Sequence, residues 1–347
     1  MPAVGTLVSG AAMMAGVSHA TTSFSIGAAV TEPLVPNAAE TMANVDTVRA
    51  ALERHRYVGS SRIATVVYLA YQLRKPVLVE GPPGVGKTEL AKTAARMLGL
   101  PLIRLQCYEG LDEAKALYEW KYGKQLLYIQ VLKEQLDDAL GGAKGLRQSV
   151  ERLHEYGDIF FSEQFLEPRP LLKALREAEG SVLLIDEIDK SDEEFESLLL
   201  EMLSDYQVTI PEIGTIAASG QPPIVFLTSN NSREVSDALK RRCLHLYIPY
   251  PDAALEQQII QAKVPEITLE LRRQLVAFVQ ALREMDLRKA PAISETIDWA
   301  RTLLLLHIDA LDDEWIRETL NVLLKFQDDV DSVEAQLPYL TRRAAGG

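Results

Sequence analysis

The chain has 347 residues, with 36 basic against 49 acidic side chains and a net charge of -13. This length exceeds what one hydrophobic core usually serves, so we expect about two domains with flexible ends. The negative charge disfavours a partner bound through a phosphate backbone, and no nucleic acid is expected. The two cysteines, Cys107 and Cys243, stand far apart and outside any C-x-x-C pattern. Neither a disulfide framework nor a zinc site is therefore predicted, and a cytoplasmic location fits.

The N-terminal segment differs in composition from the rest of the chain. Residues 1–31 contain no Lys, Arg, Asp or Glu, yet glycines and polar residues interrupt every apolar run. None of these runs approaches the ~18 residues that a membrane span needs, and the basic start of a secretory signal is missing. We expect no membrane span and interpret residues 1–45 as a disordered N-terminal extension. Export remains the alternative interpretation of the uncharged stretch.

Residues 81–89 contain the most specific motif of the chain, Gly-Pro-Pro-Gly-Val-Gly-Lys-Thr-Glu. With a strand-like run at 76–80 before it and a helical pattern after it, this is a full G-x-x-x-x-G-K-T phosphate loop, which predicts a bound nucleoside triphosphate. Its glycines let successive backbone N–H groups turn towards a polyphosphate. Lys87 supplies charge to the β- and γ-phosphates, and the Thr88 hydroxyl is placed to ligate Mg²⁺. The predicted nucleotide-binding residues are Gly81, Pro82, Pro83, Gly84, Val85, Gly86, Lys87, Thr88 and Glu89.

Strand-like and helical segments alternate after the loop. This alternation indicates a parallel sheet sandwiched by helices. Residues 206–223 instead predict an exposed β-hairpin, and Ser191 with Glu194 predict a capping box at the start of the preceding helix. The strand-like runs lie at 102–106, 181–186, 224–228 and 244–248.

The chain becomes helix-rich from residue 251 and contains no further strand-like run. Residues 251–336 are therefore predicted to form a second, all-helical domain, and residues 337–347 a flexible tail. The predicted helices of this domain cover 269–285, 294–307 and 313–326.

Two adjacent carboxylates end an apolar run within residues 182–190, Val-Leu-Leu-Ile-Asp-Glu-Ile-Asp-Lys. Apolar residues on both faces predict a central strand, so Asp186 emerges at its carboxyl end, where open α/β sheets bind ligands. There Asp186 can hold Mg²⁺ through water. Glu187 can orient or deprotonate the water that attacks the γ-phosphate. The alternative is a pair of solvated carboxylates at a strand end, which the nearby phosphate loop disfavours.

The strand-like run at 224–228 ends in Ser229 and Asn230, and a helical stretch then leads to Arg242 and Cys243. Together with the loop and the acidic pair, these residues resemble the AAA+ ATPases, and within them the MoxR-like branch, over residues 46–335. The resemblance implies an α/β P-loop core at 46–250, with a five-stranded parallel sheet of order 5-1-4-3-2 flanked by helices. It also implies a helical lid domain at 251–336 and ATP as the nucleotide.

The resemblance further implies roles for single residues. Asn230 would sense the γ-phosphate and the attacking water, and Arg242 would reach into the site of a neighbouring subunit of a homo-oligomeric, hexameric ring. A permanent charge and a planar fork suit arginine to that task, with Arg241 as the competing candidate. A basic helix end interacting with the helix dipole is the alternative for both. The predicted catalytic residues are thus Glu187, Asn230 and Arg242, and the predicted metal ligands are Thr88 and Asp186.

The lid departs from the family pattern. Many relatives carry a Ser-Pro-Arg segment at the start of a lid helix, whose arginine touches the nucleotide. Residues 293–296 here are Ile-Ser-Glu-Thr, so that arginine is absent or displaced, and Arg301 is only a weak substitute.

Aromatic residues are concentrated at 107–128, soon after the second strand-like run. In AAA+ rings the loop at this place often lines the central pore, where aromatic side chains could grip a peptide. The alternative, which we favour, is that they pack predicted helices at 125–140 and 144–156 onto the sheet. The residues are Tyr108, Tyr118, Trp120, Tyr122 and Tyr128.

Two segments, 102–127 and 208–216, look most like the maturation ATPase that accompanies aerobic carbon monoxide dehydrogenase. This narrower resemblance implies a von Willebrand factor A domain partner and a folded metalloenzyme client. The function predicted from the sequence is therefore an ATP-driven remodelling chaperone. An AAA+ motor acting on nucleic acid and a small-molecule P-loop kinase are the alternatives.

Overall fold

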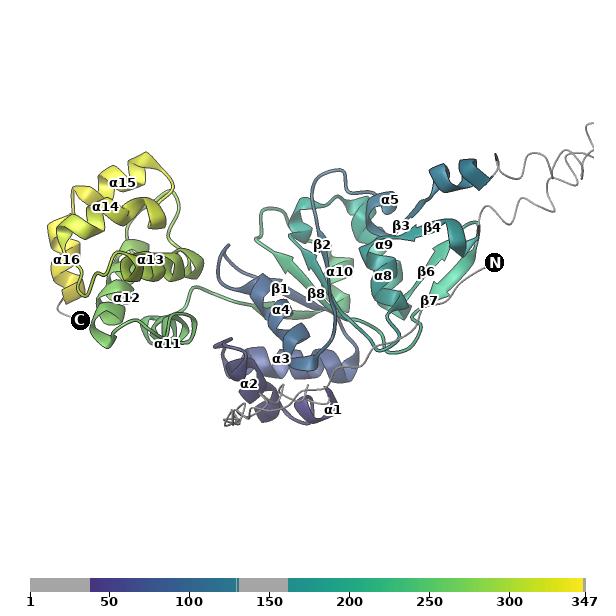
Figure 1. Ribbon diagram of the computed structural model, residues 1–347, viewed down its shortest axis with the longest axis horizontal. Helices are drawn as coiled ribbons and strands as arrows, with labels where there is room; N and C mark the ends of the chain where they lie inside the picture. The colour runs from purple at the N-terminus through teal and green to yellow at the C-terminus, as the bar shows by residue number, and fades with distance from the viewer. Residues whose placement is uncertain (1–37, 129, 131–161, 346–347) are drawn as a thin grey trace, which may run out of the picture. The chain divides into compact units, whose positions relative to one another are not determined.

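Five parallel strands form the central sheet of the structure, a computed structural model that describes residues 38–128, 130 and 162–345 (Figure 1). These described residues all fall within one compact unit, Val35–Gly347. The strand order is β2-β5-β8-β1-β9. Counted along the chain within this sheet, the order is 5-1-4-3-2, which confirms the prediction. The strands are β1 (Val77–Glu80), β2 (Leu102–Gln106), β5 (Val182–Asp186), β8 (Ile224–Ser229) and β9 (Leu244–Tyr247).

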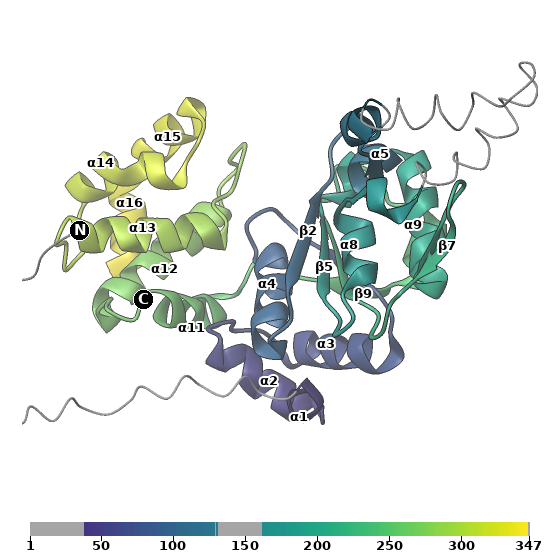
Figure 2. The same ribbon diagram turned by 45° about the vertical axis from the view of Figure 1, so that its right-hand side comes forward.

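Strand β5 shows why helices cover both faces of the sheet. All of its residues are buried, and successive side chains enter two different hydrophobic clusters. Leu183 joins the cluster of helices α8 (Pro170–Arg176) and α9 (Glu193–Asp205). Leu184 joins the cluster of helix α4 (Lys87–Leu98) on the opposite face. Figure 2 shows α4 on one side of the sheet and α8 and α9 on the other.

Short helices precede the sheet on the α4 side. Helix α1 (Ala38–Thr41) is followed by α2 (Val45–Arg54) and α3 (Ser61–Leu73), and all three contribute to the same cluster. The disordered extension predicted for residues 1–45 is wrong at its C-terminal end, because Met42 is 1% exposed and is anchored by apolar packing. The rest of that extension lies outside the described residues.

The predicted hairpin is present as β6 (Gln207–Ile210) and β7 (Gly214–Ala217), paired antiparallel. The capping box predicted for the helix before it is wrong by one residue. Asp192 is the N-cap of α9, and its side chain accepts a hydrogen bond from the Phe195 N–H at 2.9 Å. Ser191 instead donates its hydroxyl to the Ile188 carbonyl, which ends the preceding 3₁₀ turn.

A second small sheet pairs β3 (Tyr118–Trp120) with β4 (Leu166–Pro168). Trp120 is 7% exposed and belongs to the hydrophobic cluster beneath the main sheet, whereas Tyr122 is 64% exposed. The structure therefore supports a packing role for Trp120. Residues 122–128 are helical, and most of the two predicted helices at 125–140 and 144–156 lies outside the described residues. The other short elements are α5 (Glu113–Ala116), η1 (Glu163–Phe165), η2 (Ile188–Lys190) and α10 (Asp237–Arg242).

The C-terminal region is entirely helical in the structure, as predicted. A buried ion pair holds three of its helices together: the Arg283 guanidinium donates to both carboxylate oxygens of Glu256 at 2.7 and 2.8 Å. Thr296 donates its hydroxyl to the same carboxylate at 2.9 Å. The helices are α11 (Ala253–Lys263), α12 (Leu269–Arg283), α13 (Ile293–Leu305), α14 (Asp313–Leu323), α15 (Gln327–Glu334) and α16 (Leu337–Ala345).

The flexible tail predicted for residues 337–347 is wrong for the part that forms α16. Leu337, Leu340 and Ala344 are buried in the core of the helical region. They are three and four residues apart and so lie on one face of the helix, which is the pattern of an amphipathic helix packed on a core. Within the described ranges, no helix is both long and apolar enough to cross a membrane.

Replacing the buried Trp120 should destabilise the protein. We expect Trp120→Ala to lower the free energy of unfolding by about 3–5 kcal/mol, because it leaves a cavity beneath the main sheet. Tyr122→Ala is the matched control and should change stability by less than about 0.5 kcal/mol. Denaturant unfolding measures both. An unchanged unfolding midpoint for Trp120→Ala would contradict the packing role and favour the pore role.

Candidate nucleotide site

The phosphate loop connects β1 to α4 and depends on glycine at two kinds of position. Gly84 and Gly86 have positive φ angles of 74° and 96°, which glycine adopts without strain. At Gly81 the constraint is space, because an added Cβ would lie 2.1 Å from the Ile248 carbonyl oxygen. Lys87 is the first residue of α4 and follows directly.

Lys87 is folded back over the loop. It is 6% exposed, and its amine donates to the carbonyl oxygens of Gly81 at 2.6 Å and Pro82 at 2.7 Å, and to Asn230 Oδ1 at 2.7 Å. Burial lowers the pKa of Lys87 to about 8, an effect that the negative charges of Asp189 and Asp186 partly oppose. The amine is therefore held at the mouth of the loop by contacts that a phosphate group would replace.

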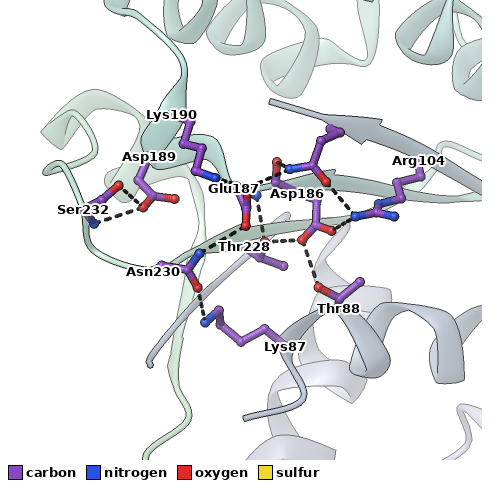
Figure 3. A network of polar contacts seen from close by, with 11 residues as sticks. Lys87, Thr88, Arg104, Asp186, Glu187, Asp189, Lys190, Thr228, Asn230 and Ser232 are labelled. Carbon is purple, nitrogen blue, oxygen red and sulfur yellow. Dashed lines mark hydrogen bonds and ion pairs between the residues drawn. The ribbon is translucent and has the colours of Figure 1, made fainter. Parts of the chain in front are cut away.

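Asp186 brings together three elements at the carboxyl end of β5 (Figure 3). Its Oδ1 accepts hydrogen bonds from the Thr88 hydroxyl at 3.0 Å and the Thr228 hydroxyl at 2.6 Å. Its Oδ2 accepts from an Arg104 guanidinium N–H at 2.6 Å. The predicted metal ligands Thr88 and Asp186 are thus adjacent.

Glu187 has an unusual backbone conformation. Its φ of 60° and ψ of 51° lie in the left-handed region, which non-glycine residues adopt at some cost and often at functional sites. Its N–H donates to the Thr228 hydroxyl at 2.9 Å. Its carboxylate accepts from Gln106 at 2.9 Å, Lys190 at 2.6 Å and Asn230 at 3.4 Å. The carboxylate of Glu187 is therefore fixed from three sides.

Asn230 links the two halves of the site. Its amide oxygen accepts from Lys87 and its amide nitrogen donates to Glu187. The loop that carries it is anchored by Asp189, which is 4% exposed and accepts from the Ser232 N–H at 3.0 Å and the Ser232 hydroxyl at 2.5 Å. Burial alone would raise the pKa of Asp189, but these hydrogen bonds outweigh it and lower the pKa.

Two cavities meet at the phosphate loop. The smaller, of about 340 Å³, is lined by Lys87, Thr88, Asp186, Glu187 and Asn230 among others. The larger, of about 630 Å³, shares Gly84, Gly86, Glu89 and Ser294 with it. Its further lining is largely apolar and aromatic, a surface suited to a nucleotide base, and includes Tyr57, Val85, Ile248, Leu255, Ile259 and Ile297.

The start of α13 lies directly on the phosphate loop. The Ser294 N–H donates to the Gly84 carbonyl at 3.3 Å, and a Cβ at Gly84 would come within 2.4 Å of the Ser294 hydroxyl. Arg301 lines the larger cavity and pairs with Asp298 at 3.5 Å. Glu89 on the cavity wall pairs with Lys263 of α11 at 3.2 Å.

Arg242 lies apart from the other predicted catalytic residues. It is exposed at the end of α10, and its Nε donates to the Ser204 hydroxyl at 2.9 Å. It does not line either cavity at the phosphate loop. The structure therefore brings together the loop, Asp186, Glu187 and Asn230 but not Arg242.

Sequence reasoning did not identify Arg104 and Gln106 as parts of the site. Both lie on β2, two positions apart, and so project from the same face of the strand. In the register of the sheet Gln106 lies beside Asp186. Polar residues at alternate positions of an otherwise apolar strand were the available signal, but their partners become known only once β2 is paired with β5.

The donor set suits Mg²⁺. Thr88 and Asp186 offer hard oxygen ligands 3.0 Å apart, and Mg²⁺ in phosphate sites commonly takes one or two protein ligands and completes its shell with phosphate and water. In the part of the chain that the structure describes, no three His, Cys, Asp or Glu side chains group to hold a metal by themselves. Thr88 and Asp186 would thus hold the ion jointly with the nucleotide.

The parallel sheet, the phosphate loop and the acidic end of β5 define the class of this region: it is an α/β fold of the P-loop AAA+ type. Residues 76–243 match the family model described as "AAA domain (dynein-related subfamily)". The matched residues run from the start of β1 to the end of α10 and include every residue placed around Asp186 above.

Several curated proteins are similar over most of the chain. An uncharacterized protein of Staphylococcus epidermidis is 28% identical over 240 residues, which cover 67% of this chain and 77% of that protein. An uncharacterized protein of Staphylococcus aureus is 27% identical over 257 residues, covering 72% and 84%. Among solved structures, RuvB of Thermotoga maritima, described as a Holliday junction branch migration motor, is 18% identical with a TM-score of 0.42, covering 77% of this chain and 70% of RuvB.

The lowered pKa of Lys87 predicts a pH-dependent nucleotide affinity. In the free protein Lys87 loses its proton near pH 8, whereas bound phosphate favours the charged amine and raises its pKa again. Binding above pH 8 must therefore take up a proton, and we expect ADP to bind about tenfold more weakly at about pH 9 than at about pH 7.

Calorimetric titrations in buffers of different ionisation enthalpy measure both the affinity and the proton uptake. Lys87→Met is the control and should bind weakly without proton uptake. Equal wild-type affinity at the two pH values would contradict the role given to Lys87.

Proposed function

We propose that the chain is an ATP-hydrolysing, Mg²⁺-dependent subunit of a ring-shaped AAA+ remodelling chaperone. The main support for ATP hydrolysis is the pair of hydrogen bonds by which Asn230 connects Lys87 to Glu187. One amide touches both the amine expected on the γ-phosphate and the carboxylate expected on the attacking water. Such a bridge supports hydrolysis that responds to the presence of the γ-phosphate.

The proposed division of labour follows the geometry of the cluster. Lys87 exchanges its contacts with loop carbonyls for phosphate oxygens, and the loop N–H groups and the N-terminus of α4 add favourable dipoles. Glu187, held by Gln106 and Lys190, orients the attacking water and takes up its proton. A bound Mg²⁺ on Thr88 and Asp186 would neutralise phosphate charge. The largely apolar cavity beside the loop would hold the base.

The ring part of the proposal rests on Arg242. It is exposed at the end of α10 and lines neither cavity of its own chain. An arginine that contacts phosphate from an adjacent subunit would need this kind of exposed position, and the residue to which Arg242 donates, Ser204, is itself exposed. We propose that it completes the site of a neighbour in a hexamer, with Arg241 as the alternative.

The proposed client is a folded metalloenzyme handled together with a von Willebrand factor A domain protein, in the cytoplasm. Support comes from the resemblance of segments 102–127 and 208–216 to the maturation ATPases of the MoxR-like branch. The second of these segments spans the β6–β7 hairpin, whose strand β7 is mostly exposed and offers a surface for a partner. The net charge of -13 supports a protein client over nucleic acid.

Replacing Glu187 tests the ATPase. Glu187→Gln keeps the size of the side chain and one acceptor oxygen but removes its basicity, so we expect kcat to fall by about 10²–10⁴-fold while ATP still binds. Glu179→Gln, an exposed site away from both cavities, is the matched control and should retain wild-type activity. Phosphate release and nucleotide titration provide the two readouts. Wild-type turnover in Glu187→Gln would refute the assignment.

Mixing two inactive variants tests the shared site. Arg242→Ala keeps its own phosphate loop, whereas Lys87→Ala keeps its arginine, so a mixed ring contains some interfaces with both parts intact. We expect each variant alone to lose activity by about 10³-fold or more and the mixture to regain part of it. Arg241→Ala in place of Arg242→Ala shows which arginine acts. No recovery on mixing, or full activity of both arginine variants alone, would contradict the trans role.

A further inference from the structure

Arg104 makes a contact that the proposed catalytic scheme does not use. Its guanidinium lies 2.6 Å from Asp186 Oδ2, the one carboxylate oxygen that neither Thr88 nor Thr228 contacts. The same nitrogen donates to Gln106 Oε1 at 2.6 Å. Figure 3 shows the guanidinium on the strand side of Asp186, away from Lys87.

The ion pair between Arg104 and Asp186 neutralises a buried negative charge. The Asp186 side chain is only 5% exposed, and a buried carboxylate without a counter-ion is costly. In the free protein two neutral hydroxyls and one cation satisfy it, and Arg104 is that cation. A divalent ion arriving beside Thr88 and Asp186 would supply the same neutralisation, so the two cations compete for one carboxylate.

Arg104 is exposed enough to move away from Asp186 into water. Its side chain is 48% exposed, so it can return to water without being stranded in a dry interior. The Arg283–Glu256 pair of the helical region is the contrast. There the arginine side chain is 8% exposed and also donates to the Pro291 carbonyl at 2.8 Å, so the pair is fixed on all sides.

We propose that Arg104 is the resident counter-ion of Asp186 and is displaced by Mg²⁺, so that it sets the Mg²⁺ concentration at which the site binds nucleotide. Arg104 is a positioning residue in this scheme and takes no part in bond breaking. The Thr88–Asp186 hydrogen bond can persist when the metal binds, because a coordinated hydroxyl still donates its proton. The inference rests on the proposed function, since it presumes that the site takes a nucleotide with Mg²⁺.

The test measures the Mg²⁺ concentration needed for half-maximal binding of a fluorescent ADP analogue. Removing the competing charge with Arg104→Met or Arg104→Gln should lower this concentration by about 2- to 5-fold, the range expected for a half-exposed charge pair. Glutamine can still donate a hydrogen bond to Asp186, so it keeps the variant testable if methionine impairs folding.

Arg49→Met is the matched control. Its side chain is 47% exposed and pairs with Asp46 on α2, and its replacement changes the net charge equally without touching the site. It should leave the Mg²⁺ half-point at the wild-type value.

Thermal unfolding with Mg²⁺ alone gives a second readout that needs no nucleotide. With a chelator, both Arg104 variants should melt below the wild type, and millimolar Mg²⁺ should raise their melting temperature more than that of the wild type. The control Arg49→Met should respond as the wild type does.

The outcomes separate the two proposals. A wild-type chain that binds no nucleotide analogue at any Mg²⁺ concentration overturns the proposed function together with this inference. A wild type that binds, with Arg104 variants that need equal or more Mg²⁺, overturns only the inference. Higher Mg²⁺ demand in the variants would mean that Arg104 assists phosphate binding instead of competing with the metal.

Discussion

The rest of the site depends on one constraint, the parallel pairing of β5 between β2 and β8. Parallel strands end at the same edge of a sheet, so the polar residues that follow each apolar run must meet there. Because β5 is buried on both faces, Asp186 meets Thr228 of β8 and Arg104 of β2 at that edge. The phosphate loop follows β1, on the other side of β8, and Lys87 closes the cluster through Asn230.

Lys87, Asp186 and Glu187 each have protein partners in the free protein. Lys87 donates to loop carbonyls, Asp186 accepts from two hydroxyls and Arg104, and Glu187 accepts from Gln106 and Lys190. Two of these contacts have a counterpart that a nucleotide and its metal ion would supply, those of Lys87 with the loop carbonyls and of Arg104 with Asp186, so binding would exchange these partners. This arrangement keeps buried charges paired in the free protein. If the site binds nucleotide as proposed, the affinity would depend on pH through Lys87 and on Mg²⁺ through Arg104.

The sequence predicted those features that depend on local chemistry. The glycines of the loop, the apolar run before Asp186 and the alternation of strands and helices follow rules of spacing, and the resemblance implied the strand order that the structure has. Arg104 and Gln106 could not be assigned, since their importance depends on which strand lies beside β5. The predicted N-cap of α9 was wrong because the Ser191 hydroxyl donates to the Ile188 carbonyl of the preceding turn. The predicted flexible tail was wrong because the short apolar stripe from Leu337 to Ala344 is stabilised by packing on the helical core, which the sequence of the tail alone does not reveal.

We propose that the edge formed by β5, β8 and the loop holds a nucleotide and its metal ion. A crystal structure of the wild-type chain with ADP, beryllium fluoride and Mg²⁺ would test this proposal. We expect the Lys87 amine to contact phosphate or fluoride, having left Gly81 and Pro82, and the metal to lie on the Thr88 hydroxyl. Phosphates bound away from the loop, or Lys87 still on the loop carbonyls beside a bound nucleotide, would contradict it.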